Sequence, residues 1–204
     1  AAAFQGVNEL CLYAHIPFCE RRCSFCEYTV VSGADVQNTE GYMQALYREL
    51  EVYQRLLGQR RLAGFDIGGG TPSYVAAEHI AELLQRVALH WDLPASVAIS
   101  IETTPRIAAE QPEKLAAYVR SGIRRISMGI QVIQPDLLKI LHRDGNGVEH
   151  HRRAVDHIRE AGFRDFGEAA EPLYRILIAL PDDLDAGRQI DQHQYHQQQR
   201  DCHT

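Results

Sequence analysis

Short apolar segments alternate along the chain with longer segments whose apolar residues recur every three or four positions. The short segments have the length and composition of strands, and the longer ones have the period of amphipathic helices. Strands are expected at residues 10–16, 64–67, 97–101, 125–130 and 175–180. Because helical segments separate these strands, the pattern predicts an α/β fold in which βα units build a parallel sheet.

Capping and breaking residues mark the expected helix boundaries. Thr39 is expected to cap the first helix, and Pro112 is expected to open a later one. A helical stretch from Asp136 to Leu141 is expected to break at Gly145-Asn146-Gly147. The helix then resumes and stops at Gly162, a residue type that favours helix C-termini.

The two ends of the chain differ from its centre. Residues 1–9 are expected to form an N-terminal extension, residues 10–181 the folded core, and residues 182–204, rich in Gln and His, a disordered polar tail. The sequence does not indicate how a parallel sheet of about five strands would close into a barrel. A last strand with nothing beside it would leave its backbone groups unpaired. The pattern therefore predicts a partial barrel that is truncated at its C-terminal side.

Composition narrows the class of protein. Of the 204 residues, 45% are hydrophobic and 24% are charged, which is typical of a globular domain. The net charge of −6 argues against general binding to nucleic acid. No apolar run approaches the roughly 20 residues that span a bilayer, and the first ten residues lack the pattern of a signal peptide. We therefore expect a cytoplasmic protein with no membrane span and no nucleic-acid partner.

Three of the five cysteines lie within eight residues, as Cys19-Glu-Arg-Arg-Cys23-Ser-Phe-Cys26. An odd number of clustered cysteines is not a secreted disulfide framework. Three thiolates on a loop after a strand can hold three irons of a cubane cluster, which leaves the fourth iron open for an exchangeable ligand. Two alternatives stay open from the spacing alone: a structural zinc site completed by His15, or three unrelated core cysteines.

The segments around and beyond this loop resemble the oxygen-independent coproporphyrinogen III oxidase-like (HemN-like) family of radical S-adenosylmethionine (SAM) enzymes. The resemblance extends over about residues 10–163, and its segments occur in the order of the family. They are Leu12-Tyr13-Ala14-His15-Ile16-Pro17-Phe18-Cys19, Gly68-Gly69-Gly70-Thr71-Pro72-Ser73, Ile101-Glu102-Thr103-Thr104-Pro105, Arg125-Ile126-Ser127-Met128-Gly129-Ile130-Gln131 and Leu141-His142-Arg143.

The resemblance implies a partial (β/α) barrel of radical SAM type that holds a [4Fe–4S] cluster on Cys19, Cys23 and Cys26 and binds SAM beside it. The positions that match SAM contacts of the family are Tyr13, Phe25, Gly69, Gly70, Thr71, Glu102, Gln131 and Arg143. Taken singly, each has a plainer explanation: a strand tyrosine, a core aromatic ring, a tight turn or a surface salt bridge. Several of the polar positions follow strand C-termini, where βα barrels place their sites.

The implied activity is reductive cleavage of SAM to a 5′-deoxyadenosyl radical, followed by oxidative decarboxylation of coproporphyrinogen in heme biosynthesis. The implied partners are a porphyrinogen substrate and an external electron donor such as flavodoxin or ferredoxin. Three alternatives are a HemN-like radical SAM methyltransferase, a heme chaperone without oxidase activity, and an inactive fragment.

Three features depart from the family pattern. Oxidases of the family commonly carry another cysteine two positions after the cluster triad, where this chain has Tyr28. Arg175 stands near the place of an expected aspartate, and the C-terminal substrate region of the family has no counterpart. These departures weaken the assignment to the oxidase and admit the heme chaperones and methyltransferases.

The remaining potential metal ligands are expected to have structural roles. Cys11 is expected to be a small buried residue of the first strand. His142, His150, His151 and His157 are expected to be solvated residues of a polar helical region.

Overall fold

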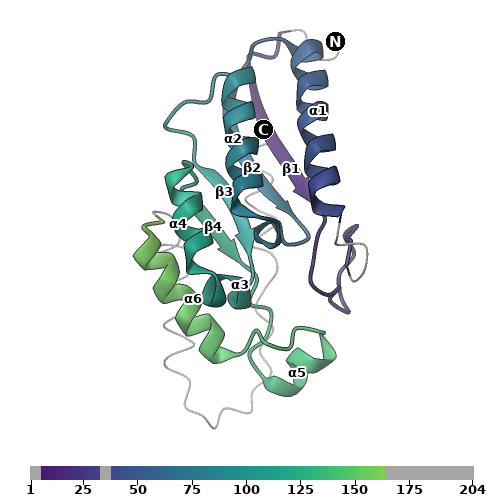
Figure 1. Ribbon diagram of the computed structural model, residues 1–204, viewed down its shortest axis with the longest axis vertical. Coiled ribbons are helices and arrows are strands. Elements are labelled where there is room, and N and C mark those ends of the chain that lie inside the picture. Colours follow the sequence, from purple (N-terminus) through teal and green to yellow (C-terminus); the bar gives the residue numbers. More distant parts are fainter. Residues whose placement is uncertain (1–5, 33–37, 164–204) are drawn as a thin grey trace.

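The computed structural model describes residues 6–32 and 38–163, which form a sheet of four parallel strands covered on one face by helices (Figure 1). The strands are β1 (Glu9–Ile16), β2 (Arg61–Gly69), β3 (Ile99–Thr103) and β4 (Arg125–Met128), and they lie in the order β1-β2-β3-β4. Each strand is thus adjacent to the next strand of the sequence and parallel to it. This arrangement confirms the predicted α/β class and the parallel sheet.

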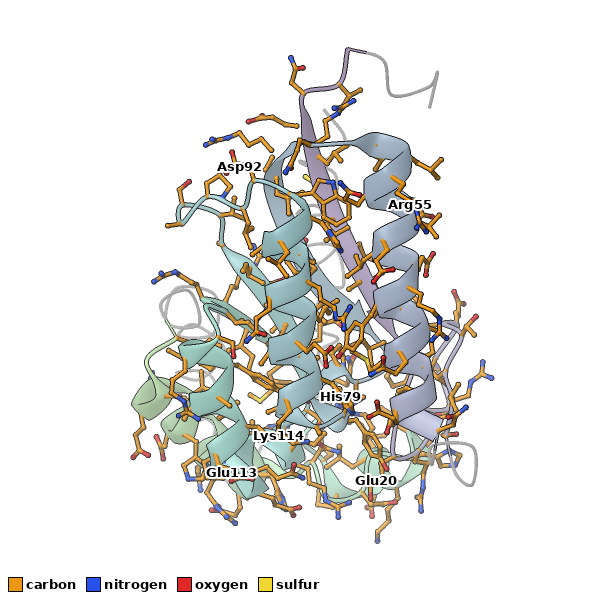
Figure 2. The ribbon with its side chains drawn as sticks, turned by 45° about the horizontal axis from the view of Figure 1, so that its top comes forward. Glu20, Arg55, His79, Asp92, Glu113 and Lys114 are labelled. Carbon is orange, nitrogen blue, oxygen red and sulfur yellow. The ribbon has the colours of Figure 1, made fainter. Side chains whose placement is uncertain are left out.

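One or more helices follow each strand along the chain, and the long helices lie on one side of the sheet, as expected for βα units. The long ones are α1 (Thr39–Leu57), α2 (Ala77–His90), α4 (Pro112–Arg120) and α6 (Val148–Ala161), and the short ones are η3 (Pro72–Tyr74), α3 (Pro105–Glu110) and α5 (Pro135–Ile140). Figure 2 shows α1 and α2 side by side over the sheet, and each buries apolar side chains, such as Tyr47 of α1 and Leu83 of α2. Among the described residues, no helix has the length and apolar character needed to cross a bilayer.

Apolar and polar residues alternate along the strands, so the sheet has one apolar face and one polar face. Ile16, Ile67, Ile101 and Ile126 are fully or almost fully buried and belong to a core shared with the helices. The residues between them lie on the opposite face, because successive side chains of a strand point to opposite sides. The opposite face carries a row of Tyr13, Asp66, Ser100 and Arg125, which are aligned across the four strands by their register.

Several expected boundaries are confirmed and others are corrected. Gly162 ends α6 in the left-handed conformation, with a φ of 89°, as predicted. Asn38 rather than Thr39 occupies the N-cap of α1, and it makes no side-chain capping bond. The short helices η3 and α3 were not expected, because three to six residues contain too little periodicity to be recognised.

The prediction that Cys11 is buried is wrong, since its side chain is exposed. It lies on the polar face of β1, which is an edge strand of the described sheet. Burial on that face needs a covering layer, whereas the helices cover the other face. The expected strand at 175–180, Arg175 and the polar tail at 182–204 lie outside the described residues, as do residues 1–5 of the expected extension.

Candidate functional site at the carboxyl ends of the strands

A cavity of about 1090 Å³ opens at the carboxyl ends of the strands. Its lining includes ten of the eleven predicted site residues, namely Cys19, Cys23, Phe25, Cys26, Gly69, Gly70, Thr71, Glu102, Gln131 and Arg143. These residues come from the carboxyl ends of β2 and β3 and from the connections after β1, β2 and β4, which meet at one edge because the strands are parallel. The cavity thus brings together residues that are up to 124 positions apart, from Cys19 to Arg143.

The cysteine loop is fixed at its base by backbone hydrogen bonds. Cys19 N donates to Val31 O at 2.9 Å, and Val31 N donates to Pro17 O at 2.8 Å. Phe18 between them is buried, and its ring packs edge-on against Tyr42 with centroids 5.3 Å apart. These bonds give the first cysteine a defined position beside the end of β1.

The glycine-rich segment after β2 packs directly against this loop. Gly70 N donates to Ile16 O at 2.9 Å and Thr71 N donates to Phe18 O at 2.8 Å. Thr71 Oγ1 also lies 3.5 Å from Cys19 Sγ. A Cβ on Gly70 would lie 2.6 Å from Pro17 O and 2.9 Å from Cys19 Sγ, so only glycine fits here without displacing the loop.

Arg143 joins the far side of the cavity to the second cysteine. Its Nη1 donates to Cys23 Sγ at 3.4 Å, and its Nη2 donates to Gly129 O at 2.7 Å. The backbone around it contacts the cysteine loop as well, because Ser24 N donates to Leu141 O at 3.3 Å. Arg143 therefore places a permanent positive charge beside the thiols.

The pKa of the Cys19 thiol is raised above its usual value, mainly by burial and also by the neighbouring Cys23 and Cys26. The hydrogen bond with Thr71 and the charge of Arg143 act in the opposite direction without cancelling the rise. Cys19 is consequently protonated at neutral pH in the metal-free chain. Binding of a metal must displace that proton, since thiolate is the ligating form.

The cavity geometry does not support the zinc alternative with His15. His15 Nδ1 lies 3.3 Å from Tyr13 Oη, and His15 Nε2 lies 3.4 Å from Thr29 O. Within residues 6–32 and 38–163, no group of three or more His, Cys, Asp or Glu side chains converges on a position for a single metal ion. A cubane cluster makes no such demand, because each cysteine ligates a different iron.

Glu102 of β3 lines the cavity, and Tyr13 of β1 lies close to it. Gly69 N donates to Glu102 Oε2 at 3.2 Å. Tyr13 does not line the cavity and lies beneath it, where a Cβ on Gly68 would be 3.0 Å from the tyrosine ring and 3.2 Å from Glu102 Cδ. Burial, followed by the negative charge of Glu102, raises the pKa of Tyr13 to about 12. Tyr13 is therefore a neutral phenol that supports the Glu102 region from below.

Three further residues form the accessible wall of the cavity. Phe25 and Tyr28 line the cavity and expose 42% and 53% of their surface, so part of each aromatic ring is accessible to a ligand. Gln131 lies three residues beyond the end of β4 rather than at its end, and its backbone has a φ of 63°. Such a conformation is uncommon for a residue other than glycine and concentrates at functional sites.

Sequence reasoning missed Asn146 and misjudged His151. Asn146 is buried in the cavity wall, where its Oδ1 accepts from Arg106 N at 3.2 Å and its Nδ2 donates to Arg143 O at 3.2 Å. The motif Gly145-Asn146-Gly147 indicated a helix break but gave no sign of this bridge. His151 is only 1% exposed, so the prediction of a solvated residue is wrong. Burial and the nearby Arg143 and His150 lower its pKa to about 4.

Comparison with known proteins identifies similar chains. Heme chaperone HemW of Haemophilus influenzae is 34% identical over 161 residues, which cover 77% of this chain and 41% of the relative. Oxygen-independent coproporphyrinogen III oxidase of Escherichia coli is 31% identical over 164 residues, which cover 80% of this chain and 35% of the relative. The solved structure of coproporphyrinogen III oxidase (HemN) from Escherichia coli, a radical SAM enzyme, superposes with a TM-score of 0.72 at 27% identity, covering 86% of this chain and 43% of that one.

The chain spans less than half the length of these relatives. The model of the radical SAM superfamily matches residues 13–181, which is most of the sequence. Members of that superfamily use a [4Fe–4S] cluster and SAM, so the two expected cofactors are confirmed at the level of the family. The chain belongs to the radical SAM superfamily.

Proposed function

We propose that this chain holds a [4Fe–4S] cluster on Cys19, Cys23 and Cys26 and binds SAM in the adjoining cavity, where the cluster cleaves it reductively. The observation that carries the proposal is that three thiols and the polar residues expected to contact SAM line one cavity of about 1090 Å³. That volume is slightly above the usual range for a small-molecule site, which suits two adjacent ligands.

The donors around the cavity suit these two groups. Three cysteines leave one iron of a cubane cluster without a protein ligand, and that iron is where SAM can bind through its amino acid part. Arg143 is held beside the thiols by Gly129 O and Cys23 Sγ, and its guanidinium would there bind the carboxylate of SAM. Glu102, which accepts from Gly69 N, supplies an acceptor for hydroxyl or ammonium groups.

The remaining residues of the cavity are proposed to contact SAM. Gly69 and Gly70 lack side chains, so the backbone can approach SAM closely. Phe25 presents an exposed ring against which an adenine can stack. When bound and reduced, the cluster and SAM supply a 5′-deoxyadenosyl radical that abstracts hydrogen from a substrate.

Anaerobic reconstitution with iron and sulfide tests the cluster assignment. The wild-type chain is expected to hold about four irons and four sulfides and to form 5′-deoxyadenosine from SAM with dithionite. Cys23→Ser is expected to lose both properties. Cys11→Ser is the matched control, since Cys11 is exposed and is not part of the cavity lining. A purified chain that prefers zinc, or that holds iron without inorganic sulfide, would refute the proposal.

For the whole protein, the first candidate activity is oxidative decarboxylation of coproporphyrinogen propionates, with electrons from flavodoxin or ferredoxin. The similarity to the Escherichia coli oxidase in sequence and in structure supports it. The test is anaerobic incubation of the full-length protein with coproporphyrinogen III, SAM and an electron donor, with porphyrins analysed after oxidation. Formation of 5′-deoxyadenosine without any decarboxylated product would exclude this activity.

A second candidate is heme binding without oxidase activity. Tyr28 favours it, because this residue lies on the cavity wall at the position where oxidases of the family commonly carry a further cysteine. The similarity to the heme chaperone HemW also supports it. Titration of the full-length protein with heme, followed by difference spectroscopy, separates the candidates: saturable heme binding without porphyrin turnover favours the chaperone.

A further inference from the structure

Lys114, near the start of α4, binds the segment that follows the glycine-rich turn. Its Nζ donates to Ser73 O at 2.8 Å, to Val75 O at 3.0 Å and to Tyr74 O at 3.3 Å. A lysine ammonium has three N–H donors, and three successive carbonyls accept them here. Only two of the 21 basic residues of the chain are lysines, Lys114 and Lys139. Figure 2 shows Lys114 at the same end of the molecule as Glu20 of the cysteine loop.

The position of Lys114 is unfavourable for a lysine on other grounds. It occupies the third residue of α4, where a positive charge opposes the helix dipole. Burial also lowers the pKa of its ammonium group, although the nearby Glu113 and Glu78 act in the opposite direction. Three charge-assisted hydrogen bonds offset these two costs. The contact is therefore specific to these carbonyls and is not a solvated surface charge.

The carbonyls that Lys114 binds belong to η3 and to the residue after it, immediately beyond Thr71. On its other side, the same segment is bonded to the cysteine loop through Gly70 N and Thr71 N. Inside the fold, Ser73 Oγ lies 2.8 Å from Thr103 Oγ1, with both side chains buried. Residues 68–75 are thus held between the cysteine loop, the end of β3 and Lys114.

We propose that Lys114 is a positioning residue for SAM: by holding the carbonyls of residues 73–75, it fixes the backbone of Gly69, Gly70 and Thr71 at the distance from the cysteine loop that SAM binding requires. This inference rests on the proposed function, because it assumes that SAM occupies the cavity. Lys114 is not part of the cavity lining, so it acts only through the segment it holds.

The test compares Lys114→Met with Lys139→Met in the reconstituted 204-residue chain. Methionine retains much of the length of lysine but has no N–H donors, and Lys139 is an exposed residue of α5. Lys114→Met is expected to bind SAM about tenfold more weakly by equilibrium dialysis, while its iron content stays at the wild-type level. Amide exchange of a peptide that covers residues 68–75 is expected to become faster in Lys114→Met, because the local opening free energy falls. Lys139→Met should match wild type in all three measurements.

Wild-type SAM affinity together with wild-type exchange in Lys114→Met would overturn the inference. A parallel loss of iron and SAM would also overturn it, because it would show a general collapse of the site. If Lys114→Met does not fold, Lys114→Arg decides, since a planar guanidinium keeps the charge but cannot donate to three successive carbonyls in the same way. Exchange in Lys114→Arg faster than in Lys139→Arg supports the inference, and equal exchange refutes it. Amide exchange needs no cofactor. If the wild-type chain binds neither iron nor SAM, exchange still shows whether Lys114 holds residues 68–75, and the failure then belongs to the proposed function.

Discussion

Replacement of Gly70 by alanine tests how closely the glycine-rich segment packs against the cysteine loop. The added Cβ would lie 2.6 Å from Pro17 O, 2.7 Å from Pro17 C and 2.9 Å from Cys19 Sγ. The first two are backbone atoms, so the loop itself has to move. Overpacking of this kind typically costs about 1–3 kcal/mol, which corresponds to a drop in Tm of about 2–12 °C for a protein of this size. The added methyl group would also displace Cys19 Sγ, a ligand of the proposed cluster. We therefore expect the affinity for the cluster to fall by about 10- to 100-fold.

Gly147→Ala is the matched control for this experiment. Gly147 has a φ of −74°, and a Cβ there would meet no atom within 4 Å. The control adds the same methyl group at the N-cap of α6, where we expect a cost of at most about 1 kcal/mol and no loss of iron. Iron and sulfide content after anaerobic reconstitution, with thermal unfolding of the same samples, measures both effects. Wild-type iron content in Gly70→Ala would show that the two segments do not pack as closely as these distances indicate.

Three further predictions concern charge. Glu102→Gln removes a negative charge that raises the pKa of Tyr13, so this pKa should fall below about 12 in an ultraviolet pH titration. An unchanged pKa would show that the two side chains are not close to each other. The pKa of His151 is lowered from 6.5 to about 4, mainly by burial, so the unfolded chain binds more protons between these values and stability is lost as the pH falls through that range. Wild type should therefore lose roughly 2 kcal/mol more than His151→Leu between pH 7 and pH 5 in urea unfolding, and equal losses would contradict the burial of the imidazole. Arg106→Gln breaks an exposed ion pair with Glu20 at 2.7 Å. We expect the free energy of unfolding to fall by less than about 1 kcal/mol, and the difference from wild type to vanish in high salt. A larger loss of stability that does not depend on salt would show that Arg106 stabilises the fold in another way.

The arrangement of the strands could be predicted because the signal is local. Segment 64–67 combines apolar residues with glycines at and just beyond its ends, and the predicted segment 125–130 is too long, because β4 ends at Met128, just before Gly129. The helices between the strands leave parallel neighbours as the simplest connection. The position of the site followed from the same reasoning. Cys19, Gly70 and Glu102 each come just after or at the end of a strand, and parallel strands bring these ends to one edge.

The parts that could not be predicted depend on contacts between distant segments. Lys114 binds carbonyls about 40 residues away, and no pattern in either segment indicates the pairing. His151 looks like a solvated helix residue in the sequence, but it is buried on α6, which packs against α3, a helix that was itself not expected. Gln131 adopts a positive φ that propensity does not predict for this residue type.

The apolar face of the sheet stabilises the fold, whereas the polar face lies beside the candidate site. Ile67 and Ile101 are buried against the helices, so truncating either to alanine is expected to cost several kcal/mol through loss of apolar contact. On the opposite face, Asp66 accepts from Ser100 Oγ and from Arg125 Nη2, the latter at 2.8 Å, and the side chains of the ion pair remain 44% and 36% exposed. A half-exposed pair of this kind contributes little to folding. The polar face lies directly below the cavity, since Tyr13 of the same row supports Gly68 and Glu102. Substitutions on the polar face should therefore affect ligand binding more than stability. Substitutions of the apolar residues under the helices should affect stability more than ligand binding.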